Sequence, residues 1–227
     1  MSSLDEGSRC RGLSVGSGAR GLEKLGAMAR PQTAADQAFE RAVRCLLDLG
    51  YHRAVGQSEG AYADALPRPS WKTALAVEGY DRLVLVDPRV PPDVPMKHGN
   101  MIHHISRARI EDVVAAEPRH PHWLQAQAGA RHRGRAVRDV LAALAPDERG
   151  LTVLEGLALV LQHPDVLAND QGVDLPGSRA HGFGVPCIAT WYGKVGLFAR
   201  SETIASPLYG AATLRAAGAG AGSKGGL

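Results

Sequence analysis

Glu155 is the residue in this sequence best placed for acid–base chemistry. It follows Thr152 by three residues and precedes an apolar run, residues 156–161. A carboxylate at the start of a buried helix loses solvation, and a desolvated carboxylate holds a proton more readily, as a general acid requires. The same spacing is that of a capping box, in which Glu155 only accepts a hydrogen bond from the backbone N–H of Thr152. Capping is the commoner role, and a helix N-terminus favours the ionised carboxylate, so both interpretations stay open.

Arg179 is the candidate ligand for an anion. It lies in the run Gly177-Ser178-Arg179, where glycine allows close backbone approach. A guanidinium group can bind a carboxylate or phosphate through two parallel hydrogen bonds. The alternative is a loop arginine that bonds backbone carbonyls, and the sequence favours neither.

The histidines gather in one region without the spacing of a metal site. Six of the nine fall between positions 98 and 132, namely His98, His103, His104, His120, His122 and His132. None forms H-x-x-x-H or H-E-x-x-H, and adjacent histidines on a strand point to opposite sides. We therefore predict no metal. We expect His104 and His163 to line a substrate site, where an imidazole can carry a proton.

Trp123 and Trp191 are two of only three tryptophans in the chain. An indole ring can stack on an aromatic substrate or a cation. Large aromatic side chains are more often part of a core, so this stacking is a supporting expectation.

The elements that must position these residues follow from hydrophobic periodicity. Helices are predicted over 33–49, 58–66 and 136–144, and from Thr152 to a stop at His163-Pro164. Strands are predicted over 82–86, 123–128, 185–191 and 194–198, the last two joined by Tyr192-Gly193. Residues 91–106 have no clear period and are predicted as a loop with one short turn. The predicted fold class is α/β (α+β), a single domain with a small mixed sheet and packed helices.

Composition is that of a globular protein. Of 227 residues, 44% are hydrophobic and 22% charged, with a net charge of +3. We predict one globular domain over 33–217, a loosely ordered or disordered tail over 1–32, and a disordered Gly/Ala tail over 218–227. The arginine cluster at 131–138 lacks interleaved aromatic residues, which predicts a solvated loop and no nucleic-acid partner.

Cysteine usage and missing motifs bound the remaining possibilities. Cys10, Cys45 and Cys187 are far apart and odd in number, which predicts reduced thiols and a cytoplasmic location. No apolar run is long enough to span a bilayer, so no membrane association is expected. The common nucleotide, dinucleotide and serine-hydrolase motifs are missing, which predicts no cofactor. A homodimer is the expected assembly, because two-fold pairs are the commonest.

Three motifs together resemble a bacterial domain-of-unknown-function family. They are Leu151-Thr152-x-x-Glu155-Gly156-Leu157-Ala158-Leu159, His163-Pro164-x-x-Leu167 and Gly177-Ser178-Arg179. In that family, the segment that corresponds to 209–213 is rich in glycine and serine and contains a cysteine and an arginine, and this chain departs from that pattern. The histidine-rich insert at 98–104 is a second departure. More loosely, the size of the chain and its lack of cofactor motifs are similar to the small Pictet–Spenglerases of specialised metabolism (streptonigrin-pathway type).

That looser resemblance implies a cofactor-independent cyclase that joins a tryptophan-like amine to an aldehyde and forms a tetrahydro-β-carboline. Glu155 would then be the acid and base, and Arg179 would hold a carboxylate or phosphate. Trp191 or Trp123 would stack on the indole, with His163 and His104 nearby. The alternative is a non-catalytic protein that binds a small molecule or a partner. A third, a basic protein associated with nucleic acid, predicts retention on DNA that depends steeply on salt.

Overall fold

The structure is a computed structural model, and it describes residues 33–70, 79–114 and 118–215. The predicted tails at 1–32 and 218–227 lie outside the described residues. The described residues form one compact α+β arrangement, which confirms the predicted fold class.

Three helices open the described chain, and two of them were predicted. Helix α1 (Ala34–Asp48) begins with a complete capping box between Thr33 and Asp36 and is followed by Gly50, whose φ is +76°. That left-handed conformation favours glycine and ends the helix. Helix α2 (Tyr51–Ala54) follows directly, and α3 (Glu59–Ala65) begins where the Ser58 hydroxyl accepts a hydrogen bond from Ala61 N.

The strands form three sheets, where the sequence predicted one. The first is antiparallel, in the order β1 (Arg82–Val86), β4 (His122–Gln127), β11 (Thr213–Arg215), β5 (Glu148–Gly150). The second is mixed, in the order β10 (Tyr209–Ala211), β6 (Gly172–Asp174), β8 (Val185–Trp191), β9 (Lys194–Arg200), β2 (Ile102–His103). The third pairs β3 (Ile110–Asp112) with β7 (Ser178–Ala180). Most of these strands have three residues or fewer, too short to show the alternation that identifies a strand in a sequence.

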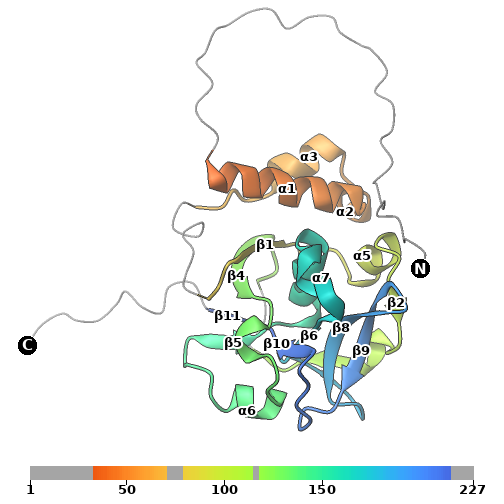
Figure 1. The fold of residues 1–227 in the computed structure, drawn as a ribbon. Helices are drawn as coiled ribbons and strands as arrows, with labels where there is room; N and C mark the ends of the chain where they lie inside the picture. The colour runs from red at the N-terminus through yellow and green to blue at the C-terminus, as the bar shows by residue number, and fades with distance from the viewer. Residues whose placement is uncertain (1–32, 71–78, 115–117, 216–227) are drawn as a thin grey trace, which may run out of the picture. The chain divides into compact units, whose positions relative to one another are not determined.

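Helix α7 (Val153–Gln162) lies at the centre of the main core. Its buried face packs against side chains of the first two sheets, among them Val84, Ile188 and Leu197. Figure 1 shows α7 between the β1–β4 strands and the β8–β9 hairpin. The short 3₁₀ segment η3 (Pro164–Asp170) follows it and adds Val166 and Leu167 to the core. The predicted capped, largely buried helix is confirmed.

Three predicted segments differ from the structure. Residues 91–106 contain helix α5 (Asp93–His98) as well as β2, and Ser178 and Arg179 of the predicted loop at 177–179 belong to β7. The helix predicted over 136–144 is the shorter α6 (Val137–Leu141). Helix α5 lacks a recognisable pattern because its stability comes from the burial of Pro95 and Met96. The remaining described elements are the 3₁₀ turns η1 (Arg107–Arg109) and η2 (Ala130–His132).

The β8–β9 hairpin was predicted correctly, including its turn. Tyr192 and Gly193 have φ values of +48° and +74°, the conformation of a two-residue type I′ turn. Side chains alternate across the two strands, so Ile188 and Leu197 enter the core while Trp191 and Phe198 lie on the opposite face.

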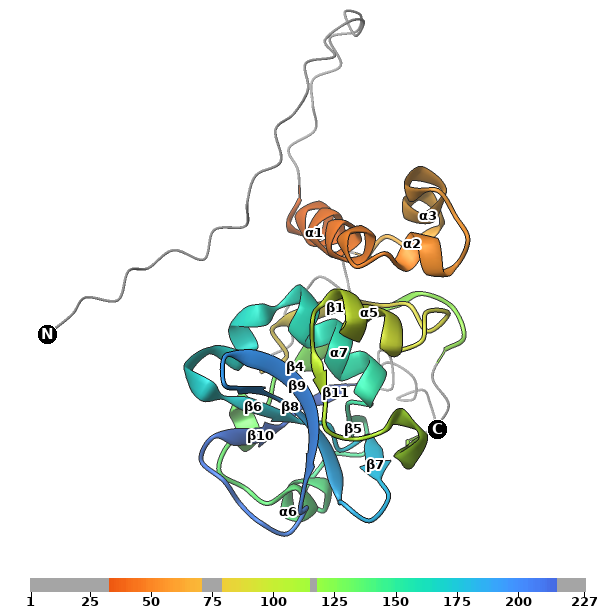
Figure 2. The same cartoon turned by 90° about the vertical axis from the view of Figure 1, so that its right-hand side faces the viewer.

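A second, smaller core joins α1, α2 and α3 to the end of β1. Phe39, Leu46 and Tyr62 pack there with Leu85 and Val90. Both views place α1 on the side of α7 opposite the hairpin (Figure 1, Figure 2), and the Cys45 thiol of α1 donates to Leu161 O at 3.4 Å. Within the described residues, no helix combines the length and apolar character needed to cross a membrane.

Candidate functional site

Glu155 carries out the capping role that its spacing predicted. Its carboxylate accepts hydrogen bonds from Thr152 N at 2.9 Å and from both terminal nitrogens of Arg149, at 2.6 and 2.8 Å. The Thr152 hydroxyl accepts from Glu155 N in return. Glu155 is fully buried, and each carboxylate oxygen has a charged partner. Arg149 had no sequence signal, because β5, which carries it, is only three residues long.

Arg179 and its neighbour Ser178 also have partners within the protein. The Arg179 guanidinium pairs with the Glu202 carboxylate. The buried Ser178 hydroxyl donates to Asp112 Oδ1 at 2.5 Å and accepts from Val153 N at 2.9 Å. Ser178 therefore ties the third sheet to the first turn of α7. The predicted anion ligand lies on strand β7 and is held by a carboxylate of its own chain.

His163 and Gln162 occupy the free edge of β1. This strand is the outermost of its sheet, so one side of its backbone has no neighbouring strand among the described residues. The Gln162 amide accepts from Leu85 N at 3.0 Å and donates to Leu85 O at 2.7 Å, and His163 Nε2 lies 3.0 Å from Leu83 O. Nε2 carries the proton in this contact, because a carbonyl oxygen can only accept. Burial is the main cause that lowers the pKa of His163, which favours the neutral ring.

The two tryptophans have different surroundings. Trp123 belongs to β4, packs against the second core, and donates its indole N–H to Pro67 O at 2.7 Å. Trp191 lies at the end of β8 with 54% of its surface exposed. The structure thus assigns Trp123 to packing and leaves Trp191 accessible.

Trp191 belongs to a group of four rings that we call the aromatic surface: His104, Trp191, Tyr192 and Phe198. The His104 and Phe198 rings stack with centroids 4.4 Å apart, and the Trp191 centroid lies 6.0 Å from that of Phe198. Tyr192 makes an edge contact with Trp191 at 5.6 Å. The structure therefore brings two of the predicted site residues, His104 and Trp191, to either side of Phe198. The sequence marked Phe198 only as a strand residue.

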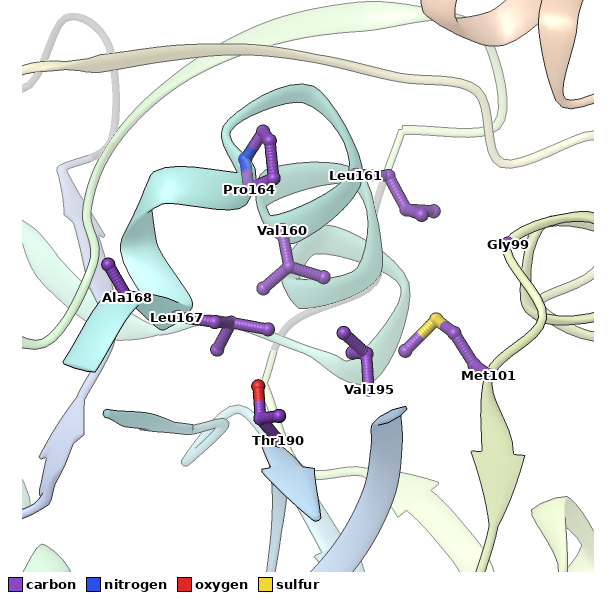
Figure 3. A pocket seen from close by; sticks show the side chains of 9 residues that line it. All are labelled: Gly99, Met101, Val160, Leu161, Pro164, Leu167, Ala168, Thr190 and Val195. Carbon is purple, nitrogen blue, oxygen red and sulfur yellow. The ribbon is translucent and has the colours of Figure 1, made fainter. Parts of the chain in front are cut away.

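On the other face of the same hairpin lies a pocket of about 290 Å³, which we call the apolar pocket. Figure 3 shows its side chains converging from α7, η3, the hairpin and the segment before β2. Its lining residues are Gly99, Met101, Val160, Leu161, Pro164, Leu167, Ala168, Thr190 and Val195. Thr190 is the one residue of this set with a polar side chain. None of the predicted site residues lines it, although His163 immediately precedes Pro164.

A second buried acid, Asp174, had no sequence signal beyond its place in an apolar run. One of its carboxylate oxygens accepts from Arg200 Nη1 at 2.8 Å, and the other has no partner among the described residues. Burial raises the pKa of Asp174 to about 6, although Arg200 acts in the opposite direction. Cys187 lies directly across the sheet, and burial, followed by the charge of Asp174, raises the pKa of its thiol to about 12. This cluster faces away from the apolar pocket, because Asp174 and Thr190 lie on opposite faces of the sheet.

The histidines and the arginine cluster remain dispersed. Within the ranges that the structure describes, no three His, Cys, Asp or Glu side chains are arranged to hold a metal ion. In the cluster, Arg131 pairs with Glu148 and Arg138 lies near Asp139, while Arg133 donates to Leu208 O. The arginines are therefore tied to their own surroundings rather than gathered on one free face.

Comparison of the chain with protein-family models, curated proteins and solved structures gave no match. The resemblance based on the Leu151–Arg179 motifs therefore stays a prediction.

Proposed function

We propose that this protein binds a small, neutral, largely apolar molecule in the apolar pocket. The observation that carries the proposal is the pocket's lining: eight of its nine residues offer apolar side chains or, at Gly99, backbone, and the ninth offers one hydroxyl. Ligand sites are typically concave and apolar, with few polar groups that fix orientation. The volume, about 290 Å³, suits a molecule with one or two rings or a short branched chain.

The polarity of the lining also limits the ligand. No side chain of the pocket carries a charge. A charged group enclosed there would lose its hydration without gaining a partner, which is unfavourable. The enclosed part of the ligand is therefore neutral, and the Thr190 hydroxyl is the side-chain group that can hydrogen-bond to it.

The test uses toluene as a probe and Met101 as the reporter. With methionine methyl groups labelled with ¹³C, toluene should shift the Met101 signal saturably and leave that of Met96 unchanged. Met96 is buried nearby in α5 but does not line the pocket. Ala168→Trp places a ring into the pocket from an exposed position and should abolish the shift. Ala205→Trp makes the same change at an exposed alanine of another loop and should preserve it. An unshifted Met101 signal, or an equal shift in Ala168→Trp, would refute the proposal.

Our second candidate is the cyclisation of a tryptophan-like amine with an aldehyde. The observation that favours it is the aromatic surface, because it presents Trp191 and His104 together. In this hypothesis Glu155 must exchange part of its pairing with Arg149 for substrate.

Incubation with tryptophan and acetaldehyde, followed by mass spectrometry for the tetrahydro-β-carboline, tests the cyclase directly. Glu155→Gln should then lose most turnover, and the exposed control Glu40→Gln should not. Normal turnover in a folded Glu155→Gln would remove Glu155 from the mechanism. We place either activity in the cytoplasm, since Cys45 and Cys187 are free thiols, and a homodimer remains the proposed assembly.

A further inference from the structure

Small residues beneath the aromatic surface allow its rings to approach one another. Ala189 and Gly196 form a cross-strand pair between Trp191 and Phe198 on the same face of the hairpin. A Cβ at Gly196 would lie 2.8 Å from the Phe198 ring and 2.7 Å from Ile102. Glycine is therefore required for the Phe198 ring to lie across the strand and meet Trp191.

The rings are also held in place before any ligand arrives. His104 N donates to Leu197 O at 3.0 Å, which fixes the chain that carries the His104 ring over Phe198. Trp191 and Phe198 belong to a regular hairpin with seven paired positions on each strand. A surface on paired strands loses little conformational freedom when it binds, which favours affinity.

Three of the four residues of the aromatic surface, His104, Trp191 and Tyr192, are exposed. Trp191 is 54% exposed and Tyr192 is 93% exposed, whereas Ala189 and Gly196 beneath them are buried. Three rings cover far less area than the roughly 1,200 Å² or more of a stable protein interface. The accessible area matches a single ring-sized molecule better than a second copy of this chain.

The charge around the rings favours an anion. Lys194 is the direct cross-strand partner of Trp191, so the two side chains start from the same face about 5 Å apart. In the described part of the chain, no carboxylate pairs with the exposed Lys194 ammonium group. The strand residues of this half of the face, from Ile102 across to Trp191, include no acidic side chain.

We propose that the aromatic surface binds a planar aromatic molecule that carries a carboxylate, with its ring stacked on Trp191 and its acidic group on Lys194. Stacking requires only an exposed π-face on the ligand. The ammonium group of Lys194 supplies the preference for an anion. This site is separate from the apolar pocket, which lies on the other face of the hairpin and carries no charge. The proposal does not depend on the proposed function.

Calorimetric titration with indole-3-acetate and its neutral analogue indole-3-acetamide tests both the stacking on Trp191 and the contact with Lys194. The wild-type protein should bind the acetate more tightly than the amide. Trp191→Ala should weaken both by about tenfold or more, as expected for the loss of one stacking contact, and Trp191→Phe should restore part of the affinity. Lys194→Gln should remove the preference for the acetate and leave amide binding unchanged.

Two control variants distinguish this site from other exposed rings and from the apolar pocket. Phe183→Ala removes an exposed ring elsewhere, which contacts Arg109, and should bind as the wild type does. Ala168→Trp fills the apolar pocket and should also leave indole-3-acetate binding unchanged. Binding lost in Ala168→Trp but kept in Trp191→Ala would overturn the proposal. So would a wild-type dimer that Trp191→Ala converts to monomer, because a second copy would then occupy the surface.

Discussion

Glu155 of α7 and Asp174 of β6 are both fully buried, but they differ in how completely their carboxylate oxygens are hydrogen-bonded. Glu155 is bound through both oxygens by Arg149 and Thr152 N. Asp174 is bound through one oxygen by Arg200, and its other oxygen has no described partner. A buried charge is stabilising only when its hydrogen-bonding capacity is met. Complete pairing makes Glu155 part of the framework. Burial, which Arg200 offsets only in part, raises the pKa of Asp174 to about 6.

The contrast indicates which of the two buried carboxylates is the better candidate for acid–base chemistry. Sequence spacing pointed to Glu155, because a carboxylate at the start of an apolar helix is easily recognised. The group whose protonation is shifted toward neutral pH is Asp174, which no motif marked. Five variants test this contrast.

Removal of the charge of Glu155 should have the largest effect. We expect Glu155→Gln to lower the free energy of unfolding by about 3 kcal/mol, the lower end for a broken buried ion pair, because Arg149 is partly exposed and regains water. Urea unfolding followed by circular dichroism measures it. A loss below about 1 kcal/mol would show that the pair contributes no more than a surface salt bridge.

Asp174 should make the protein less stable as the pH rises from about 4 to about 6. In the folded protein its pKa is about 6, against 3.8 for the free group. The native state therefore holds more protons in this window, and the free energy of unfolding falls as the pH rises through it, by up to about 3 kcal/mol. Asp174→Asn removes the titrating group. The difference in the free energy of unfolding between the wild type and this variant should therefore change across this pH range. A constant difference would mean that Asp174 is ionised throughout.

The capping boxes that begin α7 and α1 allow a matched comparison, in which we expect smaller losses of stability. Thr152 is buried beside Glu155, and Thr33 is exposed beside Asp36. We expect Thr152→Ala to cost about 2 kcal/mol and Thr33→Ala about 0.5 kcal/mol, the two ends of the range for helix caps. Thermal unfolding of both variants gives the comparison. Equal losses would mean that burial of the capping box around Glu155 adds nothing to its contribution to stability.

The ion pair of Arg179 should contribute least. Both side chains are partly exposed, so solvent screens their attraction, and Arg179→Ala should change the free energy of unfolding by less than about 1 kcal/mol. The measurement is the same urea titration. A loss as large as that of Glu155→Gln would assign Arg179 a structural role equal to that of Arg149.

Local patterns predicted much of the fold. The capping box at Thr152 and Glu155, the end of the first helix at Leu49 and the Tyr192-Gly193 turn depend on residues within four positions of each other. The prediction was wrong for residues 91–106 and for the number of sheets, because α5 and the three-residue strands are stabilised by distant contacts rather than by their own pattern. The arginine that completes the Glu155 site was missed for the same reason.

Short-range hydrogen bonds and hydrophobic periodicity made it possible to predict from the sequence where the chain turns, which helix is buried and that Glu155 is spaced to cap it. Only the tertiary structure decided that His104 and Trp191 meet at Phe198, that Asp174 lacks a second partner among the described residues, and that Met101 and Leu167 enclose one pocket. Those contacts join residues tens of positions apart, and their free energy depends on burial that exists only once the sheets and α7 have packed together.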